Sequence, residues 1–305
     1  MPAFNIDSWP WKFALMSAIL GLRLFVMLVS GAGRKVAPAA PTIHSPRGSQ
    51  AQVEKPNEIT QWCLETLDSA AVAVGLVLFL VQPFIVQAFY IPSGSMENTL
   101  LGPPPGRTSG GDRLLVSRMI YRLRDPQFQD VVVFRAPPKA IAASPEAKEG
   151  DDYIKRCIGV PGDVVWAANR EVWRNGKKLS EPYAKWSPPG RAIWAYDMKI
   201  VNGKLYSREY SSPGIVPLWR SEDGPVPLEQ QEAITSAQPG KVPPGGYLVF
   251  GDHRNNSNDG HVWGFVPRNA FLGKAICVFW PPKRVGVLDR MSFHPRTPAP
   301  GTVAQ

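Results

Sequence analysis

The sequence has few cysteines and few histidines. Cys63, Cys157 and Cys277 are odd in number and far apart, which argues against a disulfide framework and a Cys-x-x-Cys metal site. Of the four histidines, His253 and His261 stand near each other but lack a convincing third zinc ligand. The net charge of +9 comes from basic residues that are spread along the chain, which argues against a nucleic-acid partner. We therefore expect no metal site and no binding to nucleic acid.

Long helices are also lacking over most of the chain, because 32 prolines interrupt it. In their place stand short β-branched and aromatic runs bounded by turn residues. Asn175-Gly176 lies between two strand-like arms and is a strong hairpin signal. The pattern predicts a mainly β fold, with strands near residues 114–117, 131–134, 153–160, 164–166, 247–250 and 275–280.

One long stretch, residues 69–96, contains no charged residue. Its apolar core exceeds the roughly 20 residues that cross a bilayer as a helix, so it predicts a transmembrane helix over residues 69–91. An earlier apolar stretch, residues 13–33, carries Arg23 near its middle, and insertion scales give a central arginine a cost of about 2.5 to 3.5 kcal/mol. A second span, an interfacial helix and a cleavable signal peptide all fit that stretch.

The predicted layout follows from these patterns. Residues 1–68 hold the first apolar segment and a flexible linker rich in proline, alanine and serine, and residues 69–91 form the anchor. Residues 92–165 and 241–285 form a catalytic β core. Residues 166–240, with little periodicity, form an inserted β-rich subdomain, and residues 286–305 form a disordered tail. Basic residues favour a cytoplasmic linker, which places the chain after Tyr90 outside the cytoplasm.

A serine directly after the apolar stretch is the first candidate for catalysis. Ser95 lies in the segment Ile-Pro-Ser-Gly-Ser-Met, residues 91–96. Gly94 lets the backbone bring a hydroxyl close to a substrate, which suits a nucleophile. Ser-Gly-Ser also occurs in ordinary solvated turns, so this segment alone does not separate the two interpretations.

A lysine on a predicted strand is the second candidate. Because alternate side chains of a strand share a face, Tyr153 and Lys155 are expected to point to one side and Arg156 to the other. One of the two cations should then face inward. Burial lowers the pKa of a lysine and makes its neutral amine available as a base, whereas an exposed strand lysine keeps its charge.

A polar loop, residues 251–265, is the third candidate element. Its many short polar side chains next to a predicted strand indicate a hydrogen-bonded loop that orients a catalytic lysine. An alternative takes His253 or His261, with Asp252 or Asp259, as the partners of Ser95 in a Ser/His/Asp triad. Both interpretations assign the loop to an active site.

Together these segments resemble the sequence blocks of the bacterial type I signal peptidases, which are membrane-anchored Ser/Lys endopeptidases. The blocks are residues 92–96, 112–116, 153–163 and 251–264, in the family's order and directly after an apolar span. The resemblance covers about residues 69–280. It implies a signal-peptidase-like antiparallel β-sheet core, anchored in the inner (plasma) membrane with the catalytic domain on the extracytoplasmic side. The implied partners are the lipid bilayer and the signal peptides of exported preproteins, with no cofactor and with the oligomeric state left open.

The resemblance also implies roles for individual residues. Ser95 is the nucleophile and Lys155 the general base, while the backbone N–H of Ser95 and the hydroxyl of Ser93 form the oxyanion hole. Ser257 holds the lysine amine in place. Arg254 and Asp259 are implied to support the site. The implied substrate has small side chains before the cut, and the residues implied to bind it are Ile91, Pro92, Met96, Leu100, Asp152, Tyr153 and Ile154.

Three positions depart from the family pattern. Asn98 replaces a proline, Asn255 replaces an aspartate, and His261 replaces an arginine that pairs with the aspartate matching Asp259. A histidine pairs fully with an acid only when it is protonated, so we expect the Asp259 carboxylate to raise the pKa of His261.

Two other classes of protein share some of these features. Self-cleaving repressors use the same Ser/Lys chemistry, but they are soluble and carry a DNA-binding helix-turn-helix. A membrane protein that binds peptides without cutting them needs no catalytic pair. The apolar span argues against the first class, and the presence of both Ser95 and Lys155 argues against the second. A general peptidase and one dedicated to a single substrate, such as a pilin, are not separated by the sequence.

Overall fold

The computed structural model describes residues 9–29, 58–81, 85–104, 106–107, 109–187, 195–211, 214–289 and 293–295. They divide into two units, one up to Ile85 and one from Val86 onward. The predicted linker lies outside the described residues except for Glu58, which begins a helix.

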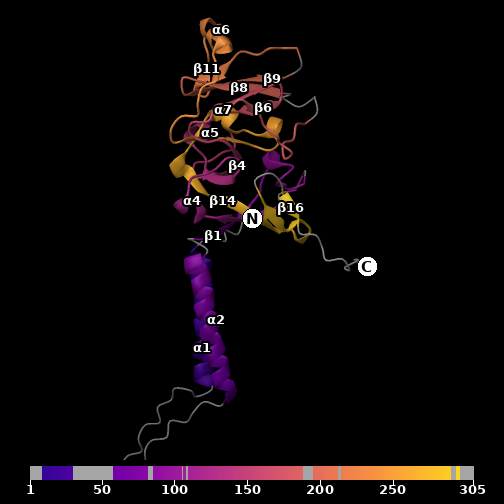
Figure 1. Cartoon of the computed structure of the whole chain (residues 1–305). Helices are drawn as coiled ribbons and strands as arrows, with labels where there is room; N and C mark the ends of the chain where they lie inside the picture. The colour runs from indigo at the N-terminus through magenta and orange to yellow at the C-terminus, as the bar shows by residue number, and fades with distance from the viewer. Residues whose placement is uncertain are drawn as a thin grey trace, which may run out of the picture. The chain divides into compact units, whose positions relative to one another are not determined.

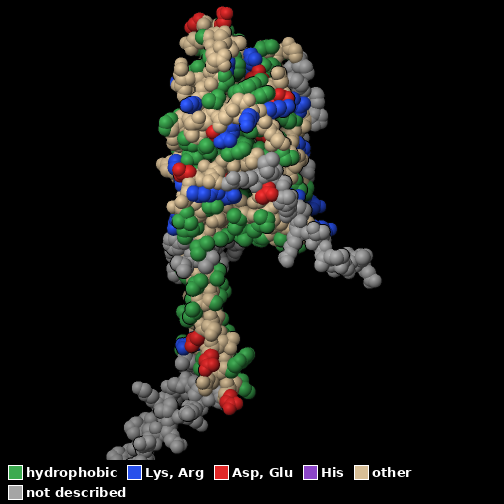
Figure 2. Space-filling model, in the orientation of Figure 1, with side chains coloured by type: hydrophobic (Ala, Val, Ile, Leu, Met, Phe, Trp, Pro, Cys, Tyr) green, Lys and Arg blue, Asp and Glu red, His purple; other side chains and the backbone are tan. Residues whose placement is uncertain are grey.

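The N-terminal unit contains two helices, α1 (Trp9–Val29) and α2 (Glu58–Leu76), and the π-helix η1 (Val77–Val81) continues α2 (Figure 1). Figure 2 shows hydrophobic side chains along the surface of this unit. Among the described helices, one segment, Gln61–Phe79, is long and apolar enough to cross a membrane, and Ala14–Val26 is a shorter apolar helix. Arg23 of α1 donates to Asp68 of α2 at 3.1 Å, so the arginine inside the first apolar stretch has an acidic partner.

The predicted transmembrane helix over residues 69–91 is wrong at both ends. At the first end, α2 begins at Glu58, because residues such as Gln61 and Glu65 form a helix-stabilising i, i+4 pair, with 2.9 Å between their side chains. At the second end, Val86–Tyr90 forms strand β1 and not helix. The sequence Val-Gln-Ala-Phe-Tyr contains β-branched and aromatic residues and pairs with strand β2.

In the second unit, nine strands of the described residues form an antiparallel sheet (Figure 1). The order is β1-β2-β14-β3-β4-β12-β13, with β15 beside β14 and β16 beside β15. The strands are β1 (Val86–Tyr90), β2 (Arg113–Ser117), β3 (Val131–Arg135), β4 (Asp152–Gly159), β12 (Gly246–Phe250), β13 (Val266–Pro267), β14 (Phe271–Trp280), β15 (Gly286–Leu288) and β16 (Phe293–Pro295). The predicted mainly β, antiparallel fold is confirmed.

The predicted disordered tail is wrong where it begins. Residues 286–288 form β15, in which Val287 pairs with Cys277 of β14, and β15 in turn pairs with β16. Backbone groups of these strands are therefore satisfied by the sheet, which extends past the predicted end of the core. The rest of the predicted tail lies almost wholly outside the described residues.

A second antiparallel sheet of seven described strands has the order β11-β10-β9-β8-β5-β6-β7. The strands are β5 (Val165–Ala168), β6 (Glu171–Arg174), β7 (Lys177–Lys178), β8 (Ala195–Val201), β9 (Lys204–Tyr210), β10 (Arg220–Ser221) and β11 (Gly224–Pro225). The hairpin at Asn175-Gly176 is confirmed, with φ of 51° and 77° between β6 and β7. Asn202-Gly203 makes the same kind of turn between β8 and β9, with the same two φ values.

Short helices connect the strands of the second unit. They are η2 (Gly94–Met96), α4 (Ile120–Leu123), α5 (Pro138–Ala142), α6 (Leu228–Ser236), η3 (Arg254–Asn256), α7 (Gly260–Trp263), η4 (Arg268–Ala270) and η5 (Pro282–Arg284). Within this unit, β8, β9, β11 and α6 lie at the end opposite β1 (Figure 1).

Strand β4 lies between β3 and β12 and is packed on both faces. Cys157 belongs to one buried apolar cluster and Ile158 to another. The sequence predicted that one cation of the strand faces inward, and both are buried, with Lys155 6% and Arg156 0% exposed. Arg156 keeps its charge because Asp252 accepts two hydrogen bonds from it, at 2.8 and 2.7 Å.

Candidate active site

Ser95 lies on the short helix η2, in the connection between β1 and β2. The side chain of the next residue, Met96, is fully buried in the core and fixes this helix against the first sheet. Ser95 itself is half-buried. A hydroxyl on a rigid turn, with its backbone anchored by a buried neighbour, has the position that a nucleophile requires.

The amine of Lys155 contacts this hydroxyl. Lys155 Nζ donates to Ser95 Oγ at 2.9 Å and to the carbonyl oxygen of Ile154 at 3.1 Å. Burial lowers the pKa of Lys155 to about 8, although the carboxylates of Asp259 and Asp252 act in the opposite direction. The amine is thus close enough to take the serine proton, and it loses its own proton far more easily than an exposed lysine does.

The polar loop after β12 packs directly against the nucleophile. The backbone N–H of His253 donates to the carbonyl oxygen of Ser95 at 3.0 Å. A Cβ on Gly251 would lie 2.6 Å from the same oxygen and 2.2 Å from Ser257 Oγ, so only glycine permits this approach. Asp259 Oδ2 accepts from the Gly251 N–H at 2.7 Å and holds the start of the loop.

The two predicted supports have different partners. Asp259 is fully buried and contacts the loop backbone and His261, whose ring Nδ1 lies 2.7 Å from Asp259 Oδ1. Arg254 is also fully buried, but its guanidinium donates to Glu181 at 2.9 and 2.6 Å. Arg254 therefore ties the loop to the segment before the second sheet's β8, which the sequence did not indicate.

The predicted hydrogen bond between Ser257 and Lys155 is not formed. Ser257 Oγ is buried and has no hydrogen-bond partner in the described part of the chain. The hydroxyl packs against Gly251, while the lysine amine donates to Ser95 and to the Ile154 carbonyl. Ser257 lies in the same loop as the other supports, but in this conformation it does not hold the amine.

Ser93 lies beside the nucleophile. Its hydroxyl donates to Ser95 Oγ at 3.4 Å, and its side chain is exposed to solvent. An oxygen that develops next to Ser95 Oγ during an attack on a carbonyl is within reach of the same hydroxyl.

One histidine of the alternative triad, His253, contacts other groups through its ring, although His261 does contact Asp259. His253 Nε2 lies 2.6 Å from Ser187 Oγ, and its Nδ1 lies 3.3 Å from the Gly94 carbonyl oxygen. Asp252 accepts hydrogen bonds from Arg156 and Thr99. The geometry around Ser95 therefore favours the lysine as its base over a histidine.

A cleft of about 530 Å³ opens above the pair of Ser95 and Lys155. Four of the predicted substrate residues line it, namely Pro92, Asp152, Tyr153 and Ile154. The assignment of the other three, Ile91, Met96 and Leu100, to the substrate site is wrong. Their apolar side chains point into the core of the first sheet and are 2%, 0% and 0% exposed. The remaining lining residues were not predicted and lie mostly in loops without a motif; they are Ser144, Glu146, Ala147, Asp151, Asn256 and Asn258.

A serine hydroxyl bonded to a buried lysine amine, beside an open cleft, is the arrangement of a hydrolase that uses lysine as its base. The chain belongs to the signal peptidase family, peptidase S26, whose family model matches residues 63–280. It is a serine endopeptidase, and the predicted resemblance is confirmed.

Three relatives illustrate the similarity. The chain is 38% identical over 242 residues to a probable signal peptidase I-2 of Synechocystis sp., covering 79% of this chain and 84% of that protein. It is 31% identical to a signal peptidase I of Leptolyngbya laminosa, covering 80% and 89%. With a signal peptidase I of Pseudomonas fluorescens the identity is 29%, but the alignment covers 93% of this chain and 97% of that protein.

Proposed function

We propose that this protein is a signal peptidase I that removes N-terminal signal peptides from exported preproteins, with Ser95 as nucleophile and Lys155 as general base. The observation that carries the assignment of these roles is the 2.9 Å hydrogen bond between Lys155 Nζ and Ser95 Oγ. The family and the names of the relatives support the substrate class.

The reaction follows from the positions of these groups. Neutral Lys155 takes the proton of the Ser95 hydroxyl, and the serine oxygen attacks the scissile carbonyl carbon. The oxyanion is stabilised by the Ser95 N–H and the Ser93 hydroxyl, each donor contributing about 3 kcal/mol. The lysine ammonium then protonates the leaving amine, and the neutral amine activates the water that hydrolyses the acyl-enzyme.

The substrate binds as an added strand at the edge of β4. Among the described strands, β12 pairs with β4 at residues 156–159, whereas β3 pairs with the first half of β4 at residues 152–156. The first half of β4 therefore presents an edge toward the cleft, where an extended peptide gains backbone hydrogen bonds. Tyr153 and Ile154 pack on apolar clusters and limit the width of the cleft at that edge, which selects small side chains before the cut.

The proposal includes the anchoring of the protein in a membrane. The apolar segment Gln61–Phe79 anchors the chain in the cell's inner membrane, and the ion pair between Arg23 and Asp68 supports α1 as a second membrane helix. The first sheet acts as the catalytic core on the extracytoplasmic side, and residues 166–240 act as an insertion within it. This placement puts Ser95 close in sequence to the anchor, where a signal peptide in the bilayer has its cleavage site.

Incubation of the detergent-purified protein with a preprotein tests the function. We expect a single new N-terminus directly after a small residue such as Ala, because Tyr153 and Ile154 line the cleft where the residue before the cut binds and a large side chain there would overfill it. The same preprotein with Leu before the cut should be cleaved at least about tenfold more slowly, the range of discrimination that a pocket shows for a few methylene groups. The readout is N-terminal sequencing of the product.

The Ser95→Ala variant is the control for a contaminating protease. Cleavage at the same rate by that variant would contradict the proposed function. Equal cleavage of the Ala and Leu substrates by the wild type would contradict the pocket assignment and leave the peptidase assignment intact.

A further inference from the structure

His261 is buried in the second unit with a carboxylate at each ring nitrogen. Nδ1 lies 2.7 Å from Asp259 Oδ1, and Nε2 lies 3.2 Å from Glu209 Oε1. An ionised carboxylate only accepts hydrogen bonds, so both nitrogens donate and the ring carries a positive charge. The ring of Tyr196 stacks on it, with centroids 3.9 Å apart and planes 7° apart, and an aromatic face attracts a cation.

Asp259 connects this imidazolium to the nucleophile. One of its carboxylate oxygens accepts from His261 and the other accepts from the Gly251 N–H. Gly251 in turn lies against the carbonyl of Ser95 with no room for a Cβ. A shift of Asp259 therefore moves the backbone that positions Ser95 against Lys155.

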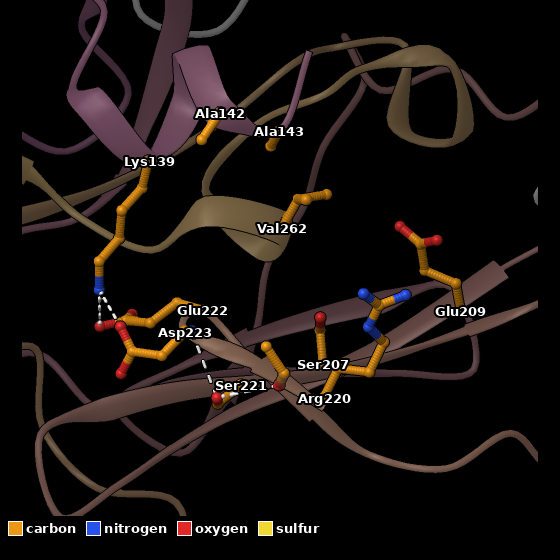
Figure 3. A pocket seen from close by; sticks show the side chains of 11 residues that line it. Lys139, Ala142, Ala143, Ser207, Glu209, Arg220, Ser221, Glu222, Asp223 and Val262 are labelled. Carbon is orange, nitrogen blue, oxygen red and sulfur yellow. Dashed lines mark hydrogen bonds and ion pairs between the residues drawn. The ribbon is translucent and has the colours of Figure 1, made fainter. Parts of the chain in front are cut away.

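Glu209 reaches His261 from strand β9 of the second sheet. It lines a cleft of about 610 Å³ between β9, β10, α5 and α7. Figure 3 shows the Glu209 carboxylate at one end of this cleft and Lys139 at the other, with Arg220 next to Glu209. The hydrogen bond from His261, together with the nearby charges of His261 and Arg220, lowers the pKa of Glu209, so the carboxylate is ionised.

We propose that Glu209 is a positioning residue of the peptidase, which holds His261 as an imidazolium so that Asp259 stays fixed beneath the catalytic loop. This inference rests on the proposed function. It explains how a histidine serves at a position where the family pattern has an arginine. An arginine is always charged, whereas the histidine needs the second carboxylate, Glu209, to stabilise its protonated form. It also assigns to the second sheet a part in catalysis.

The charge of His261 sets the upper pH limit of this arrangement. Burial opposes the charge, but the carboxylates of Asp259 and Glu209 raise the pKa of His261 to about 9. Other charged or titratable groups act on the same residues from neighbouring elements: Lys155 on Asp259, Arg220 on Glu209, and Arg254 on Tyr196. Above that pH the ring loses its proton, and one carboxylate loses its donor.

The Glu209→Gln variant tests the proposal through the pH dependence of kcat/KM. Removing one of two carboxylates should lower the pKa of His261 by about one unit, so the alkaline limb of the profile moves about one unit toward lower pH. The acid limb, set by Lys155, should stay in place. Adding His261→Arg to this variant should return the alkaline limb to high pH, because arginine keeps its charge.

A second readout needs no cleavage. The imidazole proton signals of His261 in an NMR titration should show the same downward shift in Glu209→Gln, so a protein without peptidase activity still tests this inference separately from the proposed function. The matched control is Asp223→Asn, an exposed carboxylate of the same cleft that pairs with Lys139 and Lys204. Superimposable profiles and titrations for wild type and Glu209→Gln, or an equal shift in Asp223→Asn, would overturn the proposal.

Discussion

Replacement of Ser95 by Ala or of Lys155 by Met lowers kcat/KM by at least about 10³-fold, and the double variant is scarcely worse than either single one. The reason is that the two groups act in one proton transfer across the 2.9 Å hydrogen bond, so the loss of either removes the whole step. Met has nearly the length of Lys and fills the same space without an amine. The measurement is kcat/KM on a preprotein for wild type, both single variants and the double variant.

The matched control is Lys178→Met, which removes a lysine whose side chain is 55% exposed and which pairs with Glu171 at the surface. Its activity should equal that of the wild type. Losses that add in the double variant would show that Ser95 and Lys155 act independently and do not share one proton transfer.

The same Lys155→Met variant should be more stable than the wild type, by about 3 kcal/mol at pH 7. Burial lowers the pKa of Lys155 from 10.5 to about 8, so between these values the unfolded chain binds more protons than the folded one. The wild type therefore gains stability as the pH rises through this window, and below it the cost of burying the amine is present in full. Methionine has no such cost.

Denaturant unfolding at two pH values measures this effect. At pH 10 the advantage of Lys155→Met should fall below about 1 kcal/mol, because the amine is then almost wholly neutral in the folded protein and pH 10 lies only 0.5 below the pKa of 10.5 in the unfolded chain. Lys178→Met should stay within about 0.5 kcal/mol of the wild type at both values. A variant that is less stable than the wild type at pH 7 would mean that the charged amine is well solvated in the fold.

The first sheet was predictable because its strands show the expected composition. Val131–Arg135 and Gly246–Phe250 are β-branched or aromatic runs with turn residues around them. The second sheet was read only in part, although Asn202-Gly203 carries the same hairpin signal as Asn175-Gly176. Strand β8 was not predicted, because it is buried on both faces and yet contains a charged residue, Asp197, whose carboxylate is paired with Arg208.

The site was predictable where a motif specifies chemistry, and not where the fold decides the direction of a side chain. The Ser95 and Lys155 segments are far apart in sequence, and their contact was inferred from motifs alone. The burial of Ile91, Met96 and Leu100 depends on which face of the loop meets the sheet. Their apolar character does not predict this, because apolar side chains are found in a core as well as in a pocket. The partnership of His261 with Glu209 joins residues 52 positions apart and has no sequence signal.

The pH dependence of kcat/KM for the wild-type protein tests the central claim most directly, because it reports the ionisation of the free enzyme's essential base. With Lys155 as that base, the rate should rise with pH through an apparent pKa of about 8 and be carried by the neutral amine. A profile that rises instead near pH 6.5, the ordinary pKa of histidine, would contradict the Ser95–Lys155 pair and return the role of base to a histidine.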